Sequence, residues 1–139
     1  RMGAGDFNAA MNRATAVKVL IESPLGIENI AAIADALGID IVGIGTNDLS
    51  AELGVAGDFR HPRVRAAHEA ALAACLRVGK PLAIGGIADA AYSAELVHRG
   101  AAPFLMTGID TDLLLAAMHE RVAKTPSSVG IENGDTPVR

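Results

Sequence analysis

The chain has 139 residues, with 12 Lys and Arg against 16 Asp and Glu and a formal net charge of −4. This acidic balance argues against a nucleic-acid-binding protein, which needs basic clusters, and no apolar run reaches the roughly 20 residues that span a bilayer. Half of the residues are hydrophobic but only 3% are aromatic, which is typical of helices packed on a buried sheet. The single cysteine, Cys75, excludes an internal disulfide and predicts a reducing, cytoplasmic location.

The first elements are a short helix over Phe7–Arg13 and a strand over the apolar run Val17–Ile21. A helix is then expected from Pro24, its first helical residue, to Leu37, because Ile27, Ile30, Ala34 and Leu37 recur at helical spacing. Ser23 is its expected N-cap and Gly38 lies just past its end. The chain therefore opens with a strand followed by a helix.

A second strand is expected over Ile39–Ile44, followed by a long loop over Ser50–His61. The next helix is predicted over Pro62–Val78, and Gly79 ends it. Its apolar face includes Cys75, for which buried packing is expected rather than nucleophilic chemistry. This segment forms the second strand–helix unit.

Two further units complete the pattern, and the rest of the chain is a polar tail. Their strands and helices are Pro81–Ile84 with Asp89–Arg99, and Pro103–Met106 with Thr111–Val122. Consecutive units of this kind wind right-handedly and form a parallel sheet. We therefore expect an α/β domain over residues 1–123 and a flexible polar tail over residues 124–139.

Two acidic residues follow neighbouring predicted strands. Glu22 comes directly after the first strand, and Asp48 follows the second, 26 residues later. In parallel α/β folds the carboxyl ends of the strands carry the functional site. Two carboxylates there would bind a divalent cation and leave coordination positions for substrate. The alternative is that Glu22 is a first-turn acid and Asp48 a turn residue.

Glycines also mark these strand ends. The segment Gly45-Thr46-Asn47-Asp48 is short and begins with glycine, so its backbone N–H groups can turn toward an anion. Gly43-Ile44-Gly45 superficially suggests a dinucleotide-binding fingerprint, but the position of its third glycine is occupied by Asp48, and we reject that interpretation. Gly85-Gly86 ends the third predicted strand. It either lets a ligand come close to the backbone or forms a plain tight turn.

The histidines show no metal-ligand spacing. His61 precedes a proline at a helix start, which favours a capping or turn role over catalysis. His68, His98 and His119 lie on predicted helices away from the strand ends, and we expect them at the surface.

Four sequence blocks in order and at matching spacing resemble the HpcH/HpaI aldolase family over roughly residues 7–122. These are metal-dependent class II pyruvate aldolases, such as 4-hydroxy-2-oxoheptanedioate and 2-dehydro-3-deoxyglucarate aldolases. The blocks are Leu20–Gly26, Ile44–Ser50, Leu53–Val64 and Gly108–Leu114. Phosphoenolpyruvate-utilising enzymes share the second block, but their catalytic cysteine is missing here, where the chain reads Gly85-Gly86-Ile87.

The resemblance implies the C-terminal half of a (β/α)8 barrel of the phosphoenolpyruvate/pyruvate type, about four units long. It implies that Glu22 and Asp48 bind Mg²⁺, or else Mn²⁺ or Co²⁺, and that Gly45, Thr46, Asn47 and Asp48 bind substrate. In the family, a 4-hydroxy-2-oxo acid is cleaved to pyruvate and an aldehyde through a metal-stabilised pyruvate enolate, by a hexameric enzyme. A homo-oligomer is therefore the expected assembly.

The resemblance also leaves a gap. The arginine and the histidine that complete the family's chemistry come from early strands, and no residue of this chain matches either. Leu20 and Gly86 replace residues expected near the substrate, which suggests an altered substrate preference. The chain alone is therefore expected to be incomplete and inactive. The alternatives are a non-catalytic half-barrel that binds or assembles, and a phosphoenolpyruvate/pyruvate-utilising or acyl-CoA lyase relative.

Overall fold

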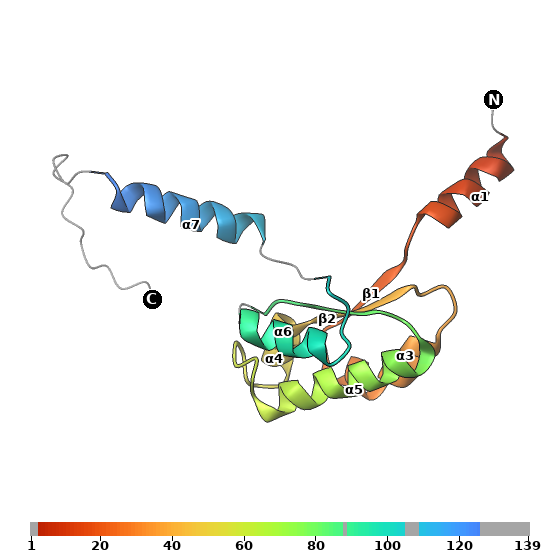
Figure 1. Cartoon of the computed structure of the whole chain (residues 1–139), viewed down its shortest axis with the longest axis horizontal. Coiled ribbons are helices and arrows are strands. Elements are labelled where there is room, and N and C mark those ends of the chain that lie inside the picture. Colours follow the sequence, from red (N-terminus) through yellow and green to blue (C-terminus); the bar gives the residue numbers. More distant parts are fainter. Residues whose placement is uncertain (1–2, 88, 105–108, 126–139) are drawn as a thin grey trace. The chain divides into compact units, whose positions relative to one another are not determined.

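The computed structural model of the chain describes residues 3–87, 89–104 and 109–125. It consists of two units, residues 1–107 and residues 108–139. The first unit has a three-stranded parallel sheet in the order β1-β2-β3, with helices packed against it (Figure 1). Its elements are α1 (Ala4–Ala14), β1 (Lys18–Ile21), α2 (Pro24–Glu28), α3 (Ile30–Asp35), β2 (Ile41–Gly45), α4 (Thr46–Glu52), α5 (Pro62–Val78), β3 (Leu82–Gly85) and α6 (Ala90–His98). The mixed α/β class is thus confirmed.

The second unit is described through a single helix, α7 (Asp110–Ala123), close to the predicted 111–122. Its side chains Leu113, Leu114 and Leu115 are each more than half exposed. Within the described ranges, no helix combines the length and the apolar character needed to cross a membrane. Of the predicted tail, residues 126–139 lie outside the described residues.

The first three predicted strands are confirmed to within two residues at their starts, and their pairing is parallel throughout. Ile21 lies opposite Ile44, and Gly45 lies opposite Gly85, so the three strands end at one edge of the sheet. The fourth strand was expected over residues 103–106. Residues 103 and 104 are not in a strand, although the N–H of Ala102 donates to the Leu82 carbonyl at 2.8 Å, and residues 105 and 106 lie outside the described residues.

The core lies between one face of the sheet and the helices. The strands alternate, so one face carries Ile21, Ile44 and Ile84, which join the apolar residues of α5 and α6 in one cluster. Cys75 belongs to this cluster and is 1% exposed, which confirms its packing role. Burial raises the pKa of its thiol. The opposite face of β1 carries Leu20, which is half exposed.

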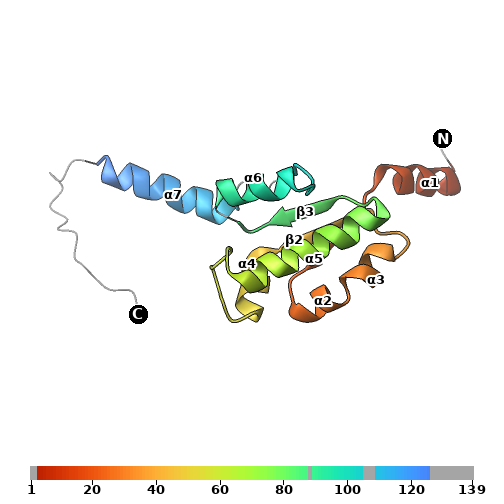
Figure 2. The same cartoon turned by 60° about the horizontal axis from the view of Figure 1, so that its bottom comes forward.

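The helix predicted over residues 24–37 begins at Pro24 as expected, but it is two short helices, α2 and α3, joined at Asn29. The Asn29 side-chain amide donates to the Leu25 carbonyl at 2.8 Å, and its backbone leaves the helical region at ψ 7°. Such side-chain bonds compete with the helical hydrogen-bond pattern. Ser23 is confirmed as the N-cap, since its Oγ accepts from the Gly26 N–H at 3.2 Å. α3 then packs beside α5 (Figure 2).

α5 spans the predicted residues 62–78 and ends at Gly79, which has a left-handed φ of +68°. His61 is confirmed as a capping residue, because its Nδ1 accepts from the Arg63 N–H at 3.2 Å. The loop predicted over residues 50–61 begins later than expected. The helix α4 continues to Glu52, and its Leu49 is fully buried in the core cluster.

Candidate functional site

Glu22 and Gly45 lie side by side at the ends of β1 and β2. Glu22 is the first residue after β1, and Gly45 is the last residue of β2. A Cβ atom on Gly45 would lie 2.5 Å from Oε1 of Glu22 and 2.7 Å from its Cγ. The Glu22 side chain therefore occupies the space that the glycine leaves empty, across the end of the neighbouring strand.

Asp48 lies in the first turn of α4, which begins directly after β2. Its side chain is exposed, and a carboxylate in this turn also interacts favourably with the helix dipole. Both predicted acids thus follow adjacent parallel strands at the same edge of the sheet. Among the described residues, neither carboxylate takes part in an ion pair.

The end of β3 closes against the start of α4. Gly86 has φ +76°, and a Cβ atom on it would lie 3.1 Å from the backbone nitrogen of Asn47 and 3.2 Å from its Nδ2. The N–H groups of a helix's first turn have no acceptor within the helix. Because position 86 is a glycine, it places no side chain against the Asn47 N–H.

This arrangement suits a magnesium-type ion in its donor set. Carboxylate oxygens are the ligands that hard divalent cations prefer, and Mg²⁺ is commonly bound through only one or two carboxylates, with waters or substrate oxygens completing its shell. Within the described part of the chain, no group of three or more His, Cys, Asp or Glu side chains is placed to hold a metal ion. Glu22 and Asp48 each offer a carboxylate of this kind at the same edge of the sheet.

His68 corrects a prediction, because it is buried and not at the surface. Its side chain is 0% exposed, and it joins two hydroxyl groups from other elements. Nε2 of His68 lies 3.1 Å from Oγ1 of Thr46, and Nδ1 lies 3.0 Å from the hydroxyl of Tyr92. Thr46 and Tyr92 are themselves 0% and 1% exposed, so this chain of hydrogen bonds is enclosed in the core. His98 and His119 are exposed, as predicted.

Two arginines flank the tyrosine at the far end of this chain. The guanidinium carbons of Arg60 and Arg65 lie 5.1 and 5.2 Å from the centre of the Tyr92 ring. Arg65 also pairs with Glu95 at 2.6 Å. Burial, and then the positive charge of Arg65, lower the pKa of His68 to about 4. The imidazole is therefore neutral at neutral pH.

One signal in the sequence could have predicted that His68 is buried in the core. The buried face of α5 includes Val64, Ala67, Ala71 and Leu72. Position 68 lies four residues after the first of these and four before the last, so it falls within the apolar stripe. Tyr92 shows no comparable signal, because its role depends on the contact with a residue 24 positions earlier.

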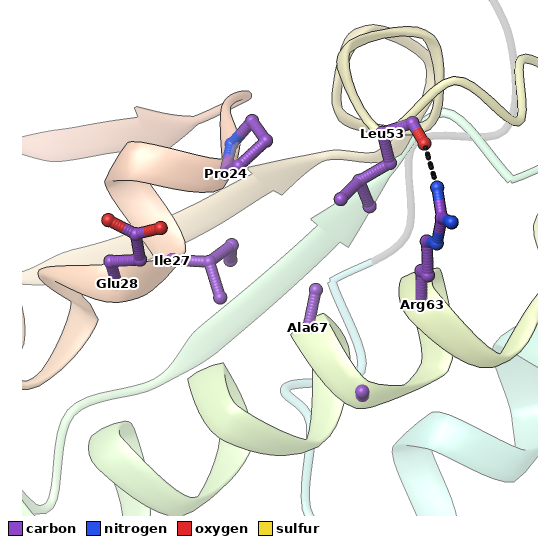
Figure 3. A pocket seen from close by; sticks show the side chains of 7 residues that line it. Pro24, Ile27, Glu28, Leu53, Arg63 and Ala67 are labelled. Atoms are coloured by element: carbon purple, nitrogen blue, oxygen red, sulfur yellow. Dashed lines mark hydrogen bonds between the residues drawn. The ribbon is translucent and has the colours of Figure 1, made fainter.

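A cavity of about 320 Å³ lies apart from these residues, between α2, the end of α4 and α5 (Figure 3). The side chain of Arg63 borders it and donates from Nη1 to the Leu53 carbonyl at 3.0 Å. None of the predicted site residues lines it. Its lining consists of Pro24, Ile27, Glu28, Leu53, Arg63, Ala66 and Ala67.

Comparison with known proteins identifies the family of this chain. Residues 3–117 match the family described as HpcH/HpaI aldolase/citrate lyase. The chain belongs to this family. Over 107 residues it is 41% identical to the 4-hydroxy-4-methyl-2-oxoglutarate aldolase of Hapsidospora irregularis, covering 76% of this chain and 40% of that protein. It is 40% identical over 109 residues to the 4-hydroxy-2-oxo-heptane-1,7-dioate aldolase of Salmonella paratyphi B, covering 78% of this chain and 41% of the relative.

A solved structure of the family also matches this chain. The HpcH/HpaI aldolase/citrate lyase family protein of Burkholderia cenocepacia superposes with a TM-score of 0.73 at 31% identity. The match covers 86% of this chain and 46% of that protein. The chain therefore spans about two fifths of the length of the curated relatives that it matches.

Proposed function

We propose that this chain carries the metal-binding and carboxylate-binding part of a lyase that cleaves a 4-hydroxy-2-oxo acid into pyruvate and an aldehyde. One observation carries the proposal: the Glu22 carboxylate lies across Gly45, at the sheet edge where the segment with Asp48 begins. Membership of the HpcH/HpaI family and the aldolase names of the relatives support the reaction class. The 4-hydroxy-2-oxo acid substrate class follows the names of those two relatives.

Each residue of the strand ends then has a defined task. Glu22 and Asp48 supply carboxylate oxygens to a divalent ion, with Mg²⁺ as the expected ion. The N–H groups of Asn47 and Asp48 donate hydrogen bonds to the substrate carboxylate, and the glycine at position 86 places no side chain against the Asn47 N–H. A divalent ion bound there supplies Lewis-acid stabilisation of the negative charge that develops on the keto oxygen.

The chain would not provide the whole reaction centre. The family's arginine and histidine match no residue of this chain, so the proton transfers would depend on the rest of the barrel. We propose that residues 1–123 correspond to the C-terminal half of a (β/α)8 barrel, a fold that needs about 250 residues. The 46% coverage of the Burkholderia protein and the exposed face of β1 support this.

Metal binding by the full chain tests the two carboxylates directly. Mn²⁺ serves as a probe, and its free concentration is followed by electron paramagnetic resonance. Glu22→Gln and Asp48→Asn are each expected to lower the affinity at least tenfold. Glu52→Gln is the matched control, because Glu52 is exposed at the opposite end of α4 from Asp48. Equal affinity of all four proteins would refute the metal site.

Activity tests the reaction. In a chimaera, this chain replaces the 109 residues of the Salmonella relative that align with it. The N-terminal region of the relative is kept. The chimaera is expected to release pyruvate from a 4-hydroxy-2-oxo acid in the presence of Mg²⁺, and Asp48→Asn is expected to slow this at least about 100-fold. A folded chimaera without activity would favour the non-catalytic alternative.

Three finer points stay predictions. The single cysteine predicts a cytoplasmic location, and the resemblance predicts a hexamer. Mg²⁺ is the predicted ion, ahead of Mn²⁺ and Co²⁺. Sedimentation of the chimaera and its activity with each ion would test the last two.

A further inference from the structure

The segment predicted to bind substrate, residues 45–48, has one buried side chain, that of Thr46, which is hydrogen-bonded in the core. Thr46 is fully buried, whereas the next two residues, Asn47 and Asp48, are exposed. The hydroxyl of Thr46 points into the core and meets Nε2 of His68 at 3.1 Å. The first residue of α4 thus faces inward at the point where its neighbours face the candidate site.

His68 is itself held in place by its second ring nitrogen. Nδ1 meets the hydroxyl of Tyr92 at 3.0 Å. The backbone N–H of Tyr92 donates to the capping carboxylate of Asp89 at 3.0 Å, and Arg60 bridges that carboxylate and the tyrosine ring. The imidazole therefore connects the start of α4 with the start of α6 through α5.

Packing alone does not account for a histidine at this position. The neighbouring positions on the buried face of α5 are Val64, Ala67, Ala71 and Leu72, all apolar. Burial of an imidazole is unfavourable unless both of its nitrogens are hydrogen-bonded. A neutral ring has one donor and one acceptor, so it orients both hydroxyl groups that it contacts.

We propose that His68 is a positioning residue that acts through Thr46. By fixing the Thr46 hydroxyl, it holds the Asn47 and Asp48 N–H groups and the Asp48 carboxylate in the orientation that the substrate and the metal ion require. This inference rests on the proposed function, because it assigns a purpose to the segment that binds pyruvate.

The experiment uses the full chain labelled with ¹⁵N and compares His68→Leu with His68→Gln. The glutamine side chain can still bond Thr46, whereas leucine fills the space without a polar atom. Pyruvate is titrated in the presence of Mg²⁺, and the amide signals of Asn47 and Asp48 report binding. His98→Leu is the control, since His98 is exposed on α6.

His68→Leu is expected to weaken pyruvate binding about tenfold or more, as is typical when a supporting hydrogen bond is lost. His68→Gln restores most of the affinity, and His98→Leu leaves it unchanged. Relaxation order parameters of the Asn47 and Asp48 amides are expected to fall from the rigid value of about 0.85 in the leucine variant. Thr46→Val is expected to match His68→Leu, and the double variant to be no worse than either.

The outcomes separate the two proposals. If the leucine variant is folded and keeps its affinity and order parameters, His68 does not position the segment. Additive losses in the double variant would also overturn the proposal, because His68 would then act independently of Thr46. If the unsubstituted chain binds no pyruvate, the proposed function fails, and the order parameters alone decide: a loss of order in the leucine variant supports the positioning role, and unchanged values overturn it.

Discussion

Acidification from pH 7 to pH 5 should destabilise this chain through His68. Burial and the charge of Arg65 lower the pKa of this histidine to about 4 in the folded chain, whereas an unfolded chain has the ordinary value of about 6.5. Between these two values the unfolded state binds more protons than the folded state. Stability therefore falls as the pH falls from about 6.5 toward 4, and no contribution of this kind remains to be lost below 4.

The size of the effect follows from the two pKa values. Each unit of difference corresponds to about 1.4 kcal/mol, so the full loss approaches about 3 kcal/mol below pH 4. At pH 5 the unfolded histidine is almost fully protonated and the folded one almost fully neutral, so about 2 kcal/mol is lost relative to pH 7. This is a large part of the total stability of a typical domain.

Urea unfolding at pH 7, 6 and 5 measures the loss. The variant His68→Gln has no titrating group at this position, and His98→Gln keeps His68 while removing an exposed histidine. Arginine partners hold the pKa values of Asp35, Asp89 and Glu95 below their ordinary range. These carboxylates act equally in all variants, so they cancel in the comparison.

The unsubstituted chain and His98→Gln should lose about 2 kcal/mol more than His68→Gln between pH 7 and pH 5. With a urea dependence of about 1–3 kcal/mol per molar, this moves the midpoint by about 1 M. If the free energy of unfolding fell equally with pH in all three proteins, the argument would be refuted. The histidine would then titrate alike in the folded and unfolded states.

Three further substitutions test the strand ends. Gly45→Ala should lower Mn²⁺ affinity at least tenfold in the resonance assay, because its methyl group would displace the Glu22 carboxylate; unchanged affinity would show that Glu22 adapts. Gly86→Ala should lower the free energy of unfolding by about 1–2 kcal/mol, because φ is +76°, and should weaken pyruvate binding by covering the Asn47 N–H. Ser23→Ala should lower the free energy of unfolding, measured in urea, by about 1 kcal/mol. Ser23→Asp keeps the cap and should leave that free energy unchanged.

Much of the site could be predicted because it depends on local pattern and topology. Apolar runs alternating with helical spacing define parallel strands, and parallel strands place their carboxyl ends at one edge. Glu22 and Asp48 therefore lie at that edge because each directly follows a strand. The helix ends at Ser23 and Gly79 were equally predictable, because capping depends on the residue itself and its nearest neighbours.

Some local features were still missed. The break at Asn29 depends on one side-chain bond to the backbone, and helical spacing continues across it. Helix α4 replaces part of an expected loop, and its Leu49 packs in a cluster of residues distant in the chain. Neither feature is encoded in the propensity of its own segment, because tertiary context and local side-chain bonds can override propensity.

The sequence by itself determined the order of the strand–helix units, the family and the two candidate metal ligands, because these are set by residue spacing along the chain. Only the tertiary structure decided the surroundings of those ligands. It brings Glu22 across Gly45, Gly86 against Asn47, and His68 between two buried hydroxyls. These contacts join residues 22 or more positions apart, and no local periodicity records them because packing between separate elements creates them.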